Sequence, residues 1–315
     1  MTRDARGTIL VAPHHFPNLD REHALAVEFG YALNAAADAD AFREGLPEAD
    51  IVMITPYAKL TAADFPVMSK CRAVIRYGIG YDNIDVAAAT EAGIPVSIVP
   101  GTASEEVASH AFAMGLALAR RLPAGDASIR DLGWAGTIGY DTPVLSDLEV
   151  GVLGMGRIGQ HVARMYQAVG ARVRAYDPFV TDSFVELTGL DDILENSDVV
   201  SLHLPLTAET GNLLSEDVLA RMRKGAVVVN VSRGGLIDEA ALAEALTSGH
   251  IAGAGIDTFA EEPLRDGHPL RSAPNTILTP HIAWRSNRST GALQDGAVER
   301  VRLALTGQPL IDLVN

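Results

Sequence analysis

Side chains suited to redox chemistry on a small acid follow predicted strands in the second half of the sequence. Arg233 and His281 each come shortly after an apolar, strand-like segment, and the carboxylates Glu261 and Glu262 follow a third. An arginine can bind a carboxylate bidentately and polarise a neighbouring carbonyl. A histidine titrates near neutral pH, so it can protonate the carbonyl oxygen as hydride reaches the carbon. The set therefore suits hydride transfer to a 2-oxo acid.

Each of these residues also has a simpler interpretation. Arg233 could form a surface salt bridge, and His281 is one of nine histidines, most of which are structural in an ordinary protein. The place of His281 after a strand and beside Pro280 favours catalysis. A carboxylate next to it would favour its protonated form. The residues alone leave open whether Glu261 or Glu262 has that role.

A glycine-rich turn lies at the centre of the sequence, in residues 149–159. An apolar strand leads into Gly154, Gly156 and Gly159, a helical run follows, and a second strand ends at Asp177, 23 positions after the first glycine. This spacing is typical of a dinucleotide site, where the glycines allow the turn, the approach of a pyrophosphate and close helix packing. The alternative is a structural turn rich in glycine, and the surrounding strands favour the dinucleotide site.

The acidic residue after the second strand indicates which dinucleotide binds. Asp177 can accept hydrogen bonds from ribose hydroxyls, and its charge would repel a 2′-phosphate, so NAD is favoured over NADP. Arg174 lies nearby, but the alternation of side chains along a strand leaves its direction open. His203 ends another predicted strand, and we expect a structural or adenine-side role for it rather than catalysis.

Short apolar strands alternate with helices in the first hundred residues. We predict strands at 8–12, 51–54, 71–76 and 95–99, and helices that include 21–36 and 86–92. Such alternation predicts a parallel sheet covered on both faces. After the third strand, the loop at residues 76–85 contains two glycines, and its backbone N–H groups could hold a carboxylate. An ordinary strand-to-helix turn is the alternative for this loop.

The same alternation continues after a long apolar helix at 107–122 and an irregular segment at 123–146, in which we expect Trp134 to pack against a helix. Predicted strands are 150–153, 172–176, 199–202, 226–229, 251–256 and 276–278, and predicted helices are 158–169, 191–195, 215–222, 239–246 and 285–305. The fold class is α/β with two doubly wound parallel-sheet domains. A Rossmann NAD-binding domain, 104–285, is inserted into a flavodoxin-like substrate domain formed by 1–103 and 286–315.

Composition narrows the class of protein further. The 315 residues carry a formal net charge of −15, which disfavours binding to nucleic acid or to an anionic membrane. The sequence shows no signal-peptide pattern and no long apolar stretch, so we predict a cytoplasmic protein. Without a cluster of Cys and His ligands, we predict no metal site.

These motifs together resemble the NAD-dependent D-isomer-specific 2-hydroxyacid dehydrogenases. The matching segments are residues 76–85, 151–159, 203–207, 229–238, 257–263 and 279–281, which cover the chain from about residue 70 onward. The resemblance implies a catalytic set of Arg233, Glu262 and His281, because the family's glutamate directly precedes the proline. It also implies that Tyr77 and Gly78 bind the substrate carboxylate through backbone N–H groups.

The resemblance implies further ligand-binding residues and partners. Asp257 would hold the nicotinamide carboxamide, and a homodimer would form through the helix from Glu105 and the loop around Trp134. Trp284 after the histidine resembles the C-terminal-binding-protein branch of the family; it could line an apolar substrate pocket or belong to the core. The predicted cofactor-binding residues are Thr102, Gly154, Gly156, Arg157, Ile158, Asp177, His203, Pro205, Thr210, Val231, Ser232 and Asp257.

Two functions fit this sequence. The first is an NAD-dependent oxidoreductase that interconverts a D-2-hydroxy acid and its 2-oxo acid. The second is an NAD(H)-sensing, corepressor-like interaction protein on the same fold. The presence of Arg233, Glu262 and His281 together favours the enzyme. Family members that act on formate carry glutamine where Glu262 stands, which argues against that activity.

Overall fold

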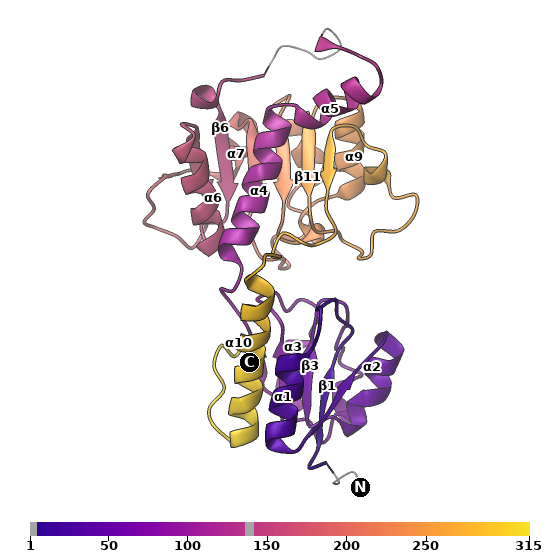
Figure 1. Cartoon of the computed structure of the whole chain (residues 1–315). Helices are drawn as coiled ribbons and strands as arrows, with labels where there is room; N and C mark the ends of the chain where they lie inside the picture. Colours follow the sequence, from indigo (N-terminus) through magenta and orange to yellow (C-terminus); the bar gives the residue numbers. More distant parts are fainter. Residues whose placement is uncertain (1–4, 136–141) are drawn as a thin grey trace. The chain divides into compact units, whose positions relative to one another are not determined.

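A computed structural model describes residues 5–135 and 142–315, which form two compact units. The first unit contains residues 1–102 and 286–315, and the second contains residues 103–285. Figure 1 shows the indigo N-terminal segments together with the yellow C-terminal helix α10 in one unit. The division falls one residue before the boundary expected at 103 and 104. Each unit is built on a parallel sheet, so the predicted α/β class is confirmed.

The first unit is a five-stranded parallel sheet in the order β2-β1-β3-β4-β5. Its strands are β1 Thr8–Val11, β2 Ala32–Ala35, β3 Ile51–Ile54, β4 Ala73–Arg76 and β5 Val96–Ile98. Its helices are α1 Asp20–Phe29, α2 Ala39–Gly45, α3 Val86–Glu91 and α10 Ser289–Thr306. Successive residues of the central strands are buried on opposite faces, which is the pattern of a sheet covered on both sides.

The predicted helix at 21–36 is wrong after Phe29. Gly30 adopts the left-handed conformation, with φ of 73°, and its N–H binds the carbonyls of Ala26 and Val27. A glycine accepts this conformation at little steric cost, so it ends the helix. The chain then returns as β2, which pairs in parallel with β1. Residues Ala32–Ala35 are apolar enough to suit either element, and only the pairing distinguishes them.

The second unit is a seven-stranded parallel sheet in the order β12-β11-β10-β9-β6-β7-β8. Its strands are β6 Glu149–Leu153, β7 Arg172–Tyr176, β8 Glu186–Leu187, β9 Val199–Leu202, β10 Val227–Asn230, β11 Gly253–Ile256 and β12 Thr276–Leu278. Its helices are α4 Ser104–Ala119, α5 Leu122–Arg130, α6 Arg157–Ala168, α7 Leu190–Asn196, α8 Glu216–Arg221 and α9 Glu239–Thr247.

Two hydrophobic cores lie on opposite faces of this sheet. Val199 belongs to the core that α4 and α6 cover, whereas its neighbour Val200 belongs to the core that α7, α8 and α9 cover. Val227 and Val228 divide in the same way. Strands buried on both faces are mostly apolar, which explains why they could be read from the sequence. Several polar residues come at or just after the ends of these strands, at the edge where the candidate site lies.

The segment predicted as irregular contains a helix. Arg121 takes a left-handed conformation, with φ of 53°, which separates α4 from α5. Helix α5 then covers Leu122–Arg130, with a proline in its first turn, where the missing N–H costs nothing. The side chain of Trp134 is 76% exposed, so the expected packing against a helix leaves most of it uncovered. Strand β8, only two residues long, was also not predicted.

Candidate active site

The glycine turn joins β6 to α6, and steric requirements explain two of its three glycines, Gly154 and Gly159. Gly154 has φ of 97°, and a Cβ there would lie 2.5 Å from the His203 carbonyl oxygen. A Cβ on Gly159 would lie 1.9 Å from the Gly154 carbonyl oxygen, so only glycine lets the helix sit this close. Gly156 is the N-cap of α6 and faces open space. The helix therefore presents its first N–H groups outward, as a pyrophosphate requires.

Arg157 and Ile158 form the first turn of α6, directly after the glycine cap. No side chain caps this helix end, so its first N–H groups remain for a ligand. Asp177, at the end of β7, supports the turn from the other side. Its Oδ2 accepts a hydrogen bond from the Met155 N–H at 2.8 Å, and its Oδ1 accepts one from the Phe179 N–H at 2.9 Å. Each oxygen keeps a further lone pair for a hydroxyl.

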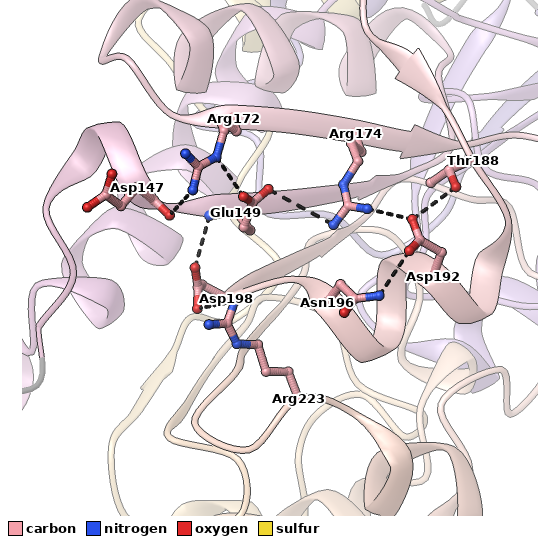
Figure 2. A network of polar contacts seen from close by, with 9 residues as sticks. All are labelled: Asp147, Glu149, Arg172, Arg174, Thr188, Asp192, Asn196, Asp198 and Arg223. Atoms are coloured by element: carbon pink, nitrogen blue, oxygen red, sulfur yellow. Dashed lines mark hydrogen bonds and ion pairs between the residues drawn. The ribbon is translucent and has the colours of Figure 1, made fainter.

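Arg174 is committed to a polar network on the same sheet. Figure 2 shows its guanidinium between Asp192 and Glu149, at 2.6 and 4.0 Å, with Thr188 also donating to Asp192. Arg172 binds the other side of Glu149 at 2.6 Å. The direction of Arg174, which the sequence left open, is therefore toward these carboxylates. This ion pairing argues against a role for Arg174 in binding a 2′-phosphate.

Replacement of Asp177 by alanine should relax discrimination against NADP. The carboxylate repels a 2′-phosphate, so its loss should raise the relative kcat/KM for NADP by roughly tenfold to a hundredfold. Steady-state kinetics with both dinucleotides measure this ratio. Asp182→Ala, which removes an exposed charge from the same loop, is the matched control. Unchanged discrimination in Asp177→Ala would show that other residues decide the cofactor.

His203 lies at the end of β9, beside the glycine turn. Its Nε2 is 2.9 Å from the Ser201 hydroxyl, and burial lowers its pKa to about 3, so the ring is neutral at pH 7. Its buried Nδ1 has no hydrogen-bond partner among the residues that the structure describes. A buried polar atom without a partner at this edge fits a site that a cofactor completes. The hydroxyl of Thr210 donates to the Pro205 carbonyl at 2.7 Å and closes the following loop.

The loop that carries Arg233 is fixed by hydrogen bonds to the ends of strands β9 and β10. The amide of Asn230 donates to the Arg233 carbonyl at 2.8 Å and accepts from the Ser232 N–H at 3.0 Å. The Ser232 hydroxyl donates to the Leu202 carbonyl at 2.7 Å, which ties the loop to β9. Val231, between them, is buried. A fixed backbone limits the positions that the Arg233 guanidinium can reach.

Gly234 packs the Arg233 loop against the segment that carries Glu262. A Cβ on Gly234 would lie 1.9 Å from the Phe259 carbonyl carbon and 2.0 Å from the Ala260 nitrogen. Only a glycine permits this approach of two backbones. The Glu262 carboxylate in turn accepts a hydrogen bond from the Phe259 N–H at 3.0 Å. The Arg233 loop and the segment that carries Glu262 are therefore fixed in position relative to each other.

His281 and Glu262 form an ion pair at this edge. The His281 Nδ1 lies 2.8 Å from the Glu262 Oε2, and their side chains are 22% and 27% exposed. Burial raises the pKa of Glu262, but hydrogen bonds from His281 and Phe259 and the charges of His281 and Arg233 hold it below its ordinary value. Glu262 therefore stays ionised at neutral pH. With Nδ1 engaged, the Nε2 of His281 is the nitrogen available to a substrate.

Asp257 anchors the turn that presents His281. It is fully buried, and its Oδ1 accepts from the Thr279 hydroxyl at 2.5 Å and from the Ile282 N–H at 2.9 Å. Its Oδ2 accepts from the Ala283 N–H at 2.9 Å. His281 itself has φ of 53°, a conformation that such bonds must hold in place. A contact to a nicotinamide carboxamide would use the remaining lone pair of Oδ2.

The indole of Trp284 folds back onto the same turn. Its Nε1 donates to the His281 carbonyl at 3.1 Å, and the Arg285 guanidinium lies 5.6 Å from its ring centroid. The side chain is half-buried. Trp284 therefore stabilises the turn at His281. The sequence suggested that it either lines an apolar substrate pocket or belongs to the core, and the stabilising contact is a third role.

Tyr77 and Gly78 belong to the first unit, at the carboxyl end of β4. Gly78 has φ of 113°, which only glycine adopts easily, and its carbonyl accepts from the Val99 N–H at 3.1 Å. The N–H groups of Gly78, Ile79 and Gly80 have no acceptor among the described residues. These N–H groups are the ones that a carboxylate could bind. Thr102 is the last residue of this unit before the chain enters the second.

Three supporting residues were missed by reasoning from the sequence. Asn230 holds the Arg233 loop, Thr279 binds Asp257, and the His110 Nε2 lies 3.0 Å from the Thr279 hydroxyl. Asn230 and Thr279 stand inside the matched motifs, so their place beside the chemical residues was the available signal. His110 comes from α4, far away in the sequence, and nothing local marks it.

Within residues 5–135 and 142–315, no group of three or more His, Cys, Asp or Glu side chains is placed to hold a metal ion. In the same part of the chain, no helix has the length and apolar character needed to cross a membrane. The expected cytoplasmic location stays a prediction.

The family model for the D-isomer-specific 2-hydroxyacid dehydrogenase NAD-binding domain matches residues 112–283, more than half of the chain. The chain belongs to the D-isomer-specific 2-hydroxyacid dehydrogenases. The matched range contains the glycine turn, Asp177, Arg233, Glu262 and His281. The second unit is therefore its NAD-binding domain.

Relatives of this chain are named for different small acids. It is 42% identical to D-3-phosphoglycerate dehydrogenase of Mycobacterium bovis over 88% of this chain and 53% of the relative, so it spans about half of that protein. It is 39% identical to glyoxylate reductase of Korarchaeum cryptofilum over 81% of this chain and 80% of the relative. Neither is a C-terminal-binding protein, and the likeness to that branch stays a hypothesis.

The fold of this chain is also that of a solved enzyme. D-lactate dehydrogenase from Aquifex aeolicus, complexed with NAD and lactic acid, matches with a TM-score of 0.87 at 28% identity. The match covers 95% of this chain and 96% of that one. Both units therefore have counterparts in an enzyme of this family.

Proposed function

We propose that the protein interconverts a D-2-hydroxy acid and its 2-oxo acid with NAD as cofactor. The observation that carries this proposal is the His281–Glu262 pair, 2.8 Å apart, at the sheet edge that also bears the glycine turn and Arg233. Ligands of open parallel sheets bind beyond the carboxyl ends of the strands. An acid–base pair, a guanidinium and a dinucleotide turn on that edge suit hydride transfer at C2.

Each side chain has a distinct task in this reaction. Arg233 pairs with the substrate carboxylate and polarises the C2 carbonyl. His281 donates a proton from Nε2 to the carbonyl oxygen during reduction and takes it back during oxidation. Glu262 stabilises the protonated imidazole through Nδ1. The N–H groups that follow Tyr77 are proposed to bind a substrate carboxylate. NAD, when bound, supplies or accepts the hydride.

Aromatic and imidazole rings surround the carboxyl edge of the first unit's sheet. The His14 ring stacks on Phe16 with centroids 5.4 Å apart, and the His15 ring meets Tyr57 edge-on at 4.6 Å. Burial lowers the pKa of His14, Glu22 opposes this shift and His15 adds to it. The His14 ring is therefore neutral at pH 7, and the edge offers rings rather than charge to a ligand.

The loops at the carboxyl edge of the first unit's sheet contain few cationic side chains. Residues 12–18, 55–59 and 77–82 contain one lysine, Lys59, and no arginine. A phosphate group is normally bound by arginines, lysines or both. We infer that the substrate carries an uncharged side chain, in contrast to the phosphorylated acid named for the mycobacterial relative.

A screen of NADH consumption tests the function and the substrate class together. We expect turnover of glyoxylate, pyruvate or larger uncharged 2-oxo acids at a kcat/KM at least tenfold above that for phosphohydroxypyruvate, since one charged contact is worth about that factor. Lys59→Met should leave the preferred substrate's KM unchanged. A preference for phosphohydroxypyruvate that Lys59→Met removes would overturn the substrate class. Tight NADH binding without turnover of any 2-oxo acid would favour the NAD(H)-sensing alternative.

Replacement of Glu262 by glutamine should lower kcat for reduction. The Glu262 carboxylate lies 2.8 Å from the His281 Nδ1 and stabilises the protonated imidazole that donates to the substrate. The glutamine amide carries no charge, so we expect kcat to fall by roughly tenfold to a hundredfold, with the Kd for NADH unchanged. Steady-state kinetics measure this fall, with Glu261→Gln as the control; an unchanged kcat would contradict the pairing.

We also propose that the protein is a homodimer formed through α4 and the segment around Trp134. Leu132 is 97% exposed and Trp134 76% exposed, and Leu122, Ile129 and Val144 are exposed nearby. Large apolar side chains gathered on one surface segment are typical of an interface. The double change Leu132→Ser and Trp134→Ser should convert a dimer to a monomer in light scattering. A monomeric wild-type protein, or a dimer that survives both changes, would contradict this interface.

A further inference from the structure

A carboxylate without a role in the proposed reaction is buried inside the first unit. Glu22, on α1, is 1% exposed. Its Oε1 accepts a hydrogen bond from the Tyr77 hydroxyl at 2.8 Å, and both of its oxygens lie near the Gln294 amide nitrogen, at 3.2 and 3.1 Å. Burying such a group is costly unless donors satisfy it. The two donors come from the end of β4 and from α10, so three elements meet at this carboxylate.

Gln294 is itself held in place. Its amide nitrogen also donates to the Asn18 carbonyl at 2.9 Å, and its side chain is buried. It lies on α10, whose start is fixed by reciprocal bonds between Ser286 and Ser289. Figure 1 shows α10 beside α1 in this unit. The donor to Glu22 therefore comes from a helix with a fixed start.

Tyr77 is fixed at both its side chain and its backbone. Its ring packs against Phe16 with centroids 4.9 Å apart, and its hydroxyl reaches Glu22. Burial raises the pKa of Tyr77 well above its ordinary value, and Glu22 adds to this, so the hydroxyl keeps the proton that it donates. The Tyr77 N–H donates to the Ile54 carbonyl at 2.9 Å, and its carbonyl accepts from the buried Arg76 guanidinium.

The next three residues carry the N–H groups that the proposed function assigns to the substrate carboxylate. Gly78 can turn these groups outward because of its φ of 113°, but glycine by itself is flexible. A preorganised site needs its flexible part held by neighbours with fixed conformations. Tyr77 is the residue directly before Gly78, and its anchor is Glu22.

We propose that Glu22 and Gln294 are positioning residues for carboxylate binding, an inference that rests on the proposed function. They hold the Tyr77 hydroxyl, and Tyr77 holds the 78–80 loop in the conformation that points its N–H groups toward the substrate. None of these three side chains needs to touch the substrate. Their loss should weaken substrate binding and leave NADH binding, a property of the second unit, unchanged.

Kinetics of three variants test this positioning. Tyr77→Phe removes one oxygen atom, and Glu22→Gln removes the charge. Each should raise the KM for a 2-oxo acid at least tenfold, change kcat less, and leave the Kd for NADH within about twofold. The double variant Glu22→Gln/Gln294→Glu places a carboxylate and an amide in contact again. Its KM should return most of the way to the wild-type value. Asp20→Asn, an exposed change on the same helix, is the control.

Hydrogen exchange gives a measurement that does not depend on activity. At equal thermal stability, the amide hydrogens of a peptide covering residues 74–82 should exchange faster in Tyr77→Phe than in the wild type. The double variant Glu22→Gln/Gln294→Glu should exchange as slowly as the wild type, unless Tyr77→Phe is added to it. An unchanged KM and unchanged exchange in folded Tyr77→Phe would overturn the positioning role. If the wild type reduces no 2-oxo acid, the proposed function fails, whereas the exchange data still decide whether Glu22 fixes the loop.

Discussion

Replacement of His281 by alanine is expected to lower kcat for 2-oxo acid reduction by roughly 10²- to 10⁴-fold, the usual contribution of a positioned general acid. The imidazole is held by Glu262 at Nδ1 and presented by a turn that Asp257 anchors, so the substitution removes a positioned acid. Binding of NADH should stay within about twofold, because the glycine turn and Asp177 are untouched.

The control for His281 is His23→Ala, which removes an exposed imidazole from α1. Stopped-flow measurement of a single turnover separates the chemical step from product release. A His281→Ala enzyme that reduces its substrate at the wild-type rate would show that the proton comes from elsewhere.

Replacement of Arg233 should have an effect of similar size on kcat/KM. Lysine keeps the charge but loses the planar fork that binds a carboxylate through two parallel hydrogen bonds. We expect Arg233→Lys to lower kcat/KM by roughly 10²-fold and Arg233→Ala by roughly 10³-fold, with both a higher KM and a lower kcat. The Asn230 amide, which fixes the loop carbonyl, should remain in place in both variants.

Arg223→Lys is the matched control for this change, because Arg223 pairs with Asp198 at 3.0 Å on the surface of the same unit. Surface pairs of this kind contribute little to stability. If Arg233→Lys kept full activity, a bidentate contact to the substrate carboxylate would be excluded. If it lost NADH binding instead, Arg233 would belong to the cofactor site.

The parts of the fold that were predicted correctly depend on short-range patterns. Strands buried on both faces are mostly apolar, and the glycine turn has steric requirements that explain Gly154 and Gly159. The segment at 21–36 failed because residues 32–35 become a strand only by pairing with β1, a contact that the local sequence does not contain. The prediction of an irregular segment where helix α5 lies was wrong for a related reason, since its glycine and proline suggested a loop.

The candidate site shows the same division. Arg233, Glu262 and His281 could be named because motifs surround them, and their order after successive strands predicted a common edge. The anchoring bonds could not be predicted, because they join residues far apart in the sequence. Asp257 illustrates this limit of short-range patterns: it was expected to face the cofactor, and most of its acceptor capacity serves the turn at His281. Glu22 had no local signal at all, since an acidic residue on a helix is usually exposed.

Transfer of deuterium from NADH tests the central claim most directly. The protein is incubated with NADH that carries two deuterium atoms at C4 of the nicotinamide, together with the most active 2-oxo acid of the screen that has at least three carbons, and the product is analysed by mass spectrometry and chiral chromatography. We predict a D-2-hydroxy acid with one deuterium at C2. NADH binding without deuterium in any 2-hydroxy acid, or a product of L-configuration, would contradict the proposed reaction.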